Sequence, residues 1–135
     1  MTTTLAPPTE TPVSAVDVEA ARITELVALR NRIDAEIADA TRALARAQVD
    51  ARLEQIAAEH VTLEQVEATI INRLGHELRV SPTRARIQLR IGRDLHAGLD
   101  RVRELFNGGS LDQPKVAAIV SAAAAPRRHR AGPGG

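Results

Sequence analysis

The sequence predicts an all-α fold, and three observations lead to this prediction. Residues 16–58 contain no Gly or Pro, so nothing in that stretch interrupts a helix. Helix-capping residues mark where further helices begin and end along the rest of the chain. No segment alternates apolar and polar residues over a useful length, as a half-buried strand does. We therefore expect a long, coiled-coil-like N-terminal helix followed by a small helix-turn-helix-like bundle.

The first part of the chain is predicted to be a tail and a long helix. Residues 1–14 are rich in Thr and Pro and are expected to be disordered. A long amphipathic helix is expected over residues 15–60. Its apolar residues recur at spacings of three and four, interrupted only at Arg30, in a heptad-like stripe of Ile23, Leu26, Ile33, Ile37, Ala40, Leu44, Ala47 and Ala51.

The length of this helix limits where the stripe can pack. Some 43 residues span about 65 Å, which is more than the small remainder of the chain can cover. A coiled coil or an antiparallel hairpin is the preferred interpretation, and a lone solvated helix is the alternative. The single aromatic residue, Phe106, leaves a modest core of Ala, Leu, Ile and Val, which also favours a partner or a second copy.

A second helix is expected to begin at Thr62. Thr62 and Gln65 have the spacing of a capping box, in which each side chain bonds the backbone of the other residue. No Gly or Pro separates this helix from the long one, so a continuous helix over residues 16–78 is the alternative.

A third helix is predicted from Pro82 to about Phe106. Ser81 is a good N-cap, and Pro82 suits the first helical position, where its missing N–H costs nothing. Residues 107–109, Asn-Gly-Gly, should end the helix through a left-handed cap.

A fourth helix completes the predicted helical, helix-turn-helix-like region over residues 61–125. It is expected to begin near residues 110–112 and to end at about Ala125. Residues 126–135, which contain Pro, Gly and three Arg, are predicted to be a basic, flexible tail.

Charge divides the chain into two halves. Residues 1–71 hold six basic and twelve acidic residues, a formal charge of −6, whereas residues 72–135 hold twelve basic and five acidic residues, a formal charge of +7. The basic half is suited to a polyanion. The alternative is that the two halves pair with each other or with a second copy.

The strongest functional signal is the stretch from Gly75 to Arg90, which has the outline of a helix-turn-helix. A small Gly75 allows two helices to cross closely, while Leu78 and Val80 anchor the turn in the core. Ala85 and Leu89 then seat the second helix against the core. The side chains left as candidates for contact with DNA phosphates or bases are Arg79, Thr83, Arg84, Arg86, Arg90 and Arg93. An ordinary helix corner with a solvated basic face is the alternative.

The same segment resembles a known family. Residues 78–95, LRVSPTRARIQLRIGRDL, followed by NGGSL at 107–111 and VAAIV at 116–120, are similar to the domain of unknown function 222 family. The resemblance covers roughly residues 62–122. It implies a helical region that stands in front of an HNH endonuclease module in actinobacterial repeat proteins.

No catalytic constellation is found in the sequence. Metal-dependent HNH chemistry needs closely placed histidines, whereas His60, His76, His96 and His129 are scattered. We expect a non-enzymatic, DNA-associated module without metal or cofactor, whose long helix joins copies of the chain. The alternatives are a coiled-coil structural protein and the truncated remnant of an HNH endonuclease. The lack of cysteine does not decide the compartment. The sequence has no signal peptide or membrane span, a bacterial-type cytoplasm fits, and a cytoplasmic location without membrane contact is predicted.

Overall fold

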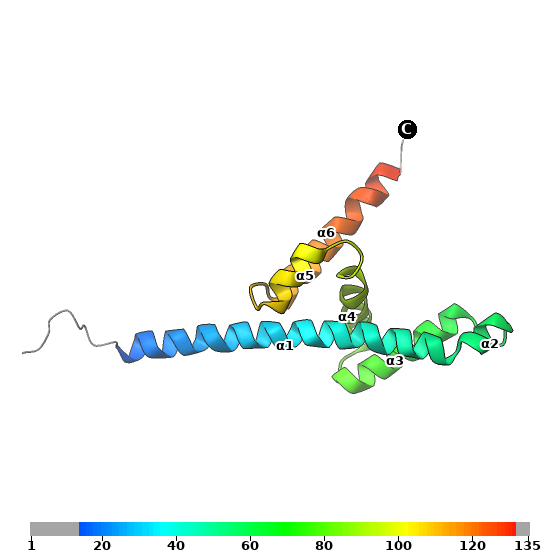
Figure 1. The fold of residues 1–135 in the computed structure, drawn as a ribbon, viewed down its shortest axis with the longest axis horizontal. Helices are drawn as coiled ribbons and strands as arrows, with labels where there is room; N and C mark the ends of the chain where they lie inside the picture. Colours follow the sequence, from blue (N-terminus) through cyan, green and yellow to red (C-terminus); the bar gives the residue numbers. More distant parts are fainter. Residues whose placement is uncertain (1–13, 132–135) are drawn as a thin grey trace, which may run out of the picture.

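The computed structural model describes the backbone of residues 14–131 and the side chains of residues 14–124. The fold class is all-α, as predicted, and the described residues contain no strand (Figure 1). They form six helices: α1 Ala15–Ala51, α2 Leu53–Ala57, α3 Leu63–Leu78, α4 Pro82–Asp94, α5 Asp100–Asn107 and α6 Gln113–Ala131. The tail predicted over residues 1–14 lies outside the described residues except for Ser14.

The long predicted helix is present as α1 and the short α2. Ser14 caps its start, because the Ser14 hydroxyl accepts a hydrogen bond of 3.0 Å from the backbone N–H of Asp17. The helix ends at Ala51, and Arg52 lies between α1 and α2 with non-helical dihedral angles. Glu59 then adopts a left-handed conformation with φ of 61°. A continuous helix over residues 16–78 is therefore wrong.

Two of the predicted helix starts are present in atomic detail. The Thr62 hydroxyl accepts from the N–H of Gln65 at 3.1 Å, and the Gln65 side chain accepts from the N–H of Thr62 at 2.8 Å, so the capping box is complete. The Ser81 hydroxyl accepts from the N–H of Arg84 at 3.3 Å, with Pro82 as the first residue of α4.

The predicted third helix is wrong in one respect, because it is broken at residues 95–99 into α4 and α5. Gly98 lies in this break with φ of 97°, a conformation that other residues rarely adopt. The bend brings Leu95 and Phe106 into one core cluster, whereas a straight helix would hold them about 17 Å apart. Gly109 has φ of 85° after α5, which confirms the left-handed cap.

The last helix begins as expected and extends beyond its expected end. An Asp112 carboxylate oxygen accepts from the N–H of Lys115 at 2.9 Å and caps the start of α6. The backbone stays helical through Pro126 to Ala131, so the first part of the predicted basic tail is helical. Residues 132–135 lie outside the described part of the chain.

Two apolar clusters hold the helices together. The first joins α1, α4, α5 and α6 and consists of Ala35, Ala38, Ile91, Leu95, Phe106, Val116 and Val120. The second joins α1, α3 and α4 and consists of Ala45, Val66, Ile70, Ile71, Leu74, Ala85 and Leu89. Helix α4 belongs to both, and it crosses α1 so closely that a Cβ on Gly92 would lie 2.6 Å from the Ala38 carbonyl oxygen.

The N-terminal part of α1 extends beyond these clusters. We call residues 15–30 the arm, and residues 31–131, which hold the rest of α1 and helices α2 to α6, the body. Figure 1 shows the arm, in blue, projecting from the body. The body touches the end of the arm through the loop after α5: a Cβ on Gly109 would lie 2.8 Å from the Ala28 carbonyl oxygen, and the Asn31 side-chain amide donates to the Gly109 carbonyl at 3.2 Å.

Candidate nucleic-acid interface

The turn between α3 and α4 has the geometry that the sequence predicts. Arg79 caps α3 in a left-handed conformation, with φ of 57° and ψ of 49°. The N–H groups of Arg79 and Val80 both donate to the Gly75 carbonyl oxygen. A Cβ on Gly75 would lie 3.2 Å from the Val80 carbonyl oxygen, so a small residue fits this close turn best. Leu78 and Val80 pack against the second cluster as expected.

Helix α4 packs against the core through the two residues that the sequence predicts for this contact. Ala85 is fully buried and Leu89 is 2% exposed. All six candidate contact residues are exposed: Arg79, Thr83, Arg84, Arg86, Arg90 and Arg93. The structure therefore places every predicted contact side chain at the surface of the helix-turn-helix.

The six side chains do not share one face. Arg84 and Arg93 are nine residues apart, about two and a half turns, and so they lie on opposite sides of α4. Arg86 and Arg90 lie between them on the solvent side, where Ile87 is also 49% exposed. A ligand that follows α4 along one side can therefore reach only part of the predicted set.

The candidate arginines also differ in whether a carboxylate already binds them. The Arg93 guanidinium donates two hydrogen bonds to Glu67 on α3, at 2.8 and 3.0 Å, and Arg90 lies 3.5 Å from Asp94. Within the described residues, no carboxylate lies within 4.0 Å of Arg79, Arg84 or Arg86. We call these three the turn arginines, because they surround the turn and the first half of α4. Arg84 and Arg86, two residues apart, lie on nearly opposite sides of α4.

Sequence reasoning did not identify the two carboxylates that hold Arg90 and Arg93. Asp94 stands four residues after Arg90, a spacing that favours ion pairs on a helix, so the signal was present. Glu67 is 26 residues from Arg93 in the sequence, and only the packing of α3 on α4 brings them together. This second pair agrees with the alternative that the acidic and basic halves of the chain bind each other.

A groove of about 450 Å³ lies beside the turn, between α1, α4 and the start of α6. Its lining includes Asp34, Ile37, Arg84 and Gln88. The Gln88 side chain is 8% exposed, and its carbonyl oxygen accepts from the Gln113 amide at 2.6 Å. Burial raises the pKa of the Asp34 carboxyl above its ordinary value of 3.8, and the charge of Arg30 opposes part of this rise.

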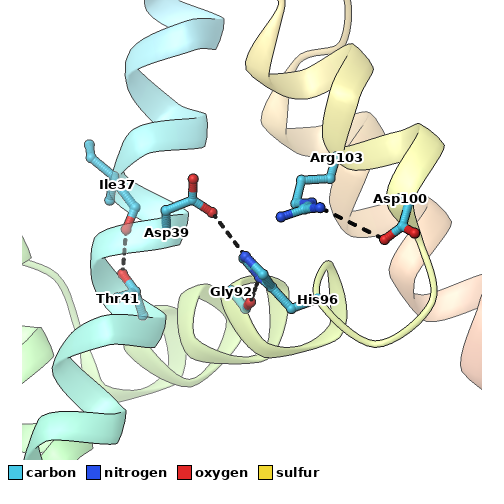
Figure 2. A network of polar contacts seen from close by, with 7 residues as sticks. All are labelled: Ile37, Asp39, Thr41, Gly92, His96, Asp100 and Arg103. Carbon is cyan, nitrogen blue, oxygen red and sulfur yellow. Dashed lines mark hydrogen bonds and ion pairs between the residues drawn. The ribbon is translucent and has the colours of Figure 1, made fainter.

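His96, just after α4, contacts Asp39 on α1 (Figure 2). Its Nε2 lies 3.6 Å from a carboxylate oxygen of Asp39, and its Nδ1 lies 3.1 Å from the Gly92 carbonyl oxygen. Asp100 and Arg103 form a separate contact of 3.8 Å within α5. The position of His96 between two helices indicates a packing role.

The structure brings no metal-ligand set together in the part of the chain that it describes. No group of three or more His, Cys, Asp or Glu side chains there is placed to hold a metal ion. His60 lies near the start of α3, His76 is exposed on α3, and the side chain of His129 is outside the described residues. Within the same part of the chain, every helix is too short or too polar to cross a membrane.

Comparisons with family models, with curated proteins and with solved structures found no match for this chain. The resemblance to the domain of unknown function 222 family therefore stays a prediction from the sequence. The functional argument depends on the geometry of α3, the turn and α4.

Proposed function

We propose that this chain is a non-catalytic helical module that contacts DNA through the turn arginines and accompanies a nuclease. The turn arginines carry the DNA part of the proposal, because three exposed guanidinium groups, none with a described carboxylate within 4.0 Å, surround the start of one helix. Such groups bind phosphate oxygens directly, often through two hydrogen bonds. The nuclease association is based on the resemblance to the domain of unknown function 222 family.

Two local features add to this support. The N-terminus of α4 presents the positive end of the helix dipole, which favours phosphate. Arg79 occupies a left-handed position where Gly would be more stable by about 1 kcal/mol. A charged, exposed side chain at a position that is costly for it agrees with a functional role.

Arg90 and Arg93 have a secondary part in the proposed contact. Each must exchange a carboxylate partner for a phosphate, which reduces the gain from the new contact by up to about 1 kcal/mol. Thr83, exposed in the first turn of α4, is placed to donate a hydrogen bond to a phosphate beside Arg86. The proposed contact is mainly with the DNA backbone, so little sequence preference is expected.

Fluorescence anisotropy with labelled duplex DNA tests this proposal. At about 50 mM salt, where phosphate contacts are strong, the chain should bind, and log Kobs should fall linearly with log salt. Arg86→Ala should weaken binding to all sequences alike and lower the salt slope by about one. Arg101→Ala, which removes the same charge from exposed α5, is the matched control and should change binding less.

A gain-of-function variant sharpens the test. Glu67→Gln frees Arg93 and removes a negative charge beside α4, so it should tighten DNA binding. No duplex binding by the unmodified chain at about 50 mM salt contradicts the proposal. Equal losses in Arg86→Ala and Arg101→Ala mean that binding follows net charge alone, which contradicts the assigned site.

A structural assembly role is the second candidate, and the exposed arm favours it. In that case α1 joins copies of the chain, whether or not DNA is bound. The two functions are separable, because the turn arginines lie on α3 and α4 and the arm lies on α1.

A further inference from the structure

We propose that residues 22–36 of α1, the end of the arm and the two turns after it, bind the same residues of a second copy as an antiparallel helix pair, with Arg22 of each copy beside Glu36 of the other. This proposal does not rest on the proposed DNA contact. It assigns a partner, an orientation and a register to a surface that the rest of the described chain leaves uncovered.

A stripe of large apolar side chains, interrupted by Arg30, runs along the arm and the first turn after it, and nothing in the described chain covers it. We call it the arm face, and its members are 44–61% exposed: Ile23 61%, Leu26 52%, Ile33 45% and Leu29 44%. Single exposed apolar residues are ordinary, but a stripe of large ones indicates an interaction surface. A helix without tertiary contacts is also only marginally stable in water, so a partner would stabilise the arm.

The arm face is directed away from the body. Helix α1 packs on its own body through Asn31, Ala35 and Ala38, which are at most 5% exposed. At 3.6 residues per turn, these residues lie more than a quarter turn around the helix from Leu26 and Ile33. Figure 1 shows the rest of the chain gathered along the later part of α1. A second helix can therefore lie along the arm face without displacing the body.

The heptad positions define the register. Ile23 and Arg30 are at a positions, and Leu26 and Ile33 are at d positions. In an antiparallel pair an a residue of one helix meets a d residue of the other, so Ile23 meets Ile33 of the second copy. The twofold axis then passes near residue 28, and Leu29 meets Leu29 of the second copy beside it.

Charge complementarity identifies a second copy as the partner. Arg22 and Glu36 both occupy g positions, on the same flank of the arm face, and g residues of antiparallel helices face each other. The register above places Arg22 opposite Glu36 of the second copy, and symmetry repeats this pair. A parallel pair would instead place Arg22 near Val27. Within 4.0 Å of Arg22, the only described carboxylate is that of Glu19. Both side chains are largely exposed, so this ion pair is weak.

Arg30 sets an upper limit on the affinity. It interrupts the apolar a and d positions, and in the pair it lies beside Leu26 of the second copy. Its stem can pack there while the guanidinium reaches water, at a cost in side-chain entropy. The pair should therefore be reversible, and Arg30→Leu should lower the dissociation constant.

Sedimentation equilibrium of the full chain over a concentration series tests the pairing. The unmodified chain should reach dimers in the micromolar range. Leu26→Lys should raise the dissociation constant at least about a hundredfold, because it places a charge in the apolar contact, beside Arg30 of the second copy. Ala21→Lys is the matched control: Ala21 is also exposed on the arm but lies outside the arm face, so dimers should persist.

A charge exchange tests orientation and register. Arg22→Glu and Glu36→Arg should each raise the dissociation constant about tenfold, because two symmetric attractions become repulsions, and the double variant should restore binding. A strict monomer at high micromolar concentration overturns the proposal. So do dimers that Leu26→Lys leaves intact, and dimers that neither charge variant weakens. DNA binding by these variants is a separate measurement, so this proposal can fail while the proposed function stands.

Discussion

The two halves of α1 differ in how they use apolar side chains. In residues 31–51 the buried positions are Ala35, Ala38 and Ala45, together with Asn31 and Thr41. In the arm, by contrast, large residues such as Ile23 and Leu26 are more than half exposed. One uninterrupted helix thus presents small residues where the body packs on it and large residues where no described element covers it.

This difference separates two tasks along one helix. Small residues let backbones approach, as at Gly92 beside Ala38 and at Gly109 beside Ala28. The apolar volume of the core then comes from the helices that pack on α1, above all from Phe106, which is fully buried. Large residues in the arm contribute little to this core, so folding of the body and association of the arm should respond to different substitutions.

The largest expected contrast is between Phe106→Ala and Leu26→Ala. Phe106→Ala removes the largest side chain of the first cluster and should lower the free energy of unfolding by about 3–5 kcal/mol. Leu26→Ala should change it by less than about 0.5 kcal/mol in the monomer, because Leu26 is exposed and Leu and Ala are both good helix formers. Urea unfolding measures both free energies, at a protein concentration below the dissociation constant of the dimer. Similar losses in the two variants would mean that the arm is part of the folded core.

A second contrast uses one substitution in both halves of α1. Ala38→Leu inserts a large side chain where α4 crosses α1, and overpacking should cost about 3 kcal/mol. Ala21→Leu makes the same change at an exposed arm position outside the arm face and should be nearly neutral. Thermal unfolding followed by circular dichroism compares them. A tolerated Ala38→Leu would show that the crossing is looser than the contact at Gly92 indicates.

The sequence predicts well those features whose causes are local. The Thr62 and Gln65 capping box, the Ser81 cap and the left-handed Gly109 all involve residues within a few positions of one another. The burial of Ala85 and Leu89 follows from helical periodicity combined with the turn template. These features set the position of the candidate interface, which is why all six predicted contact residues are found exposed.

The features that depend on distant residues could not be predicted in this way. A single glycine such as Gly98 does not by itself predict the end of a helix. The break between α4 and α5 is explained by packing, because it brings Leu95 and Phe106 into the same cluster. The partner of Arg93 is Glu67, on another helix, so the sequence overestimates the number of arginines without a partner. The orientation of the arm face likewise depends on which side of α1 the body covers.

The smallest expected effect concerns Asp34, at the boundary between the two halves of α1. Burial raises the pKa of its carboxyl above 3.8, with Arg30 opposing the rise, and Arg84 lines the same groove from α4. A raised pKa in the folded state means that the folded chain binds this proton more tightly than the unfolded chain. Asp34 therefore contributes a loss of stability that appears as the pH rises above 3.8 and persists at neutral pH.

Asp34→Asn removes this loss and should raise the free energy of unfolding at neutral pH by less than about 1 kcal/mol. Its advantage over the unmodified chain should shrink as the pH falls towards 3.8, where Asp34 is increasingly protonated in both states. Melting temperatures of the two chains, measured side by side across this pH range, provide the test. A variant that is less stable at neutral pH would mean that attraction to Arg30 outweighs the cost of burial.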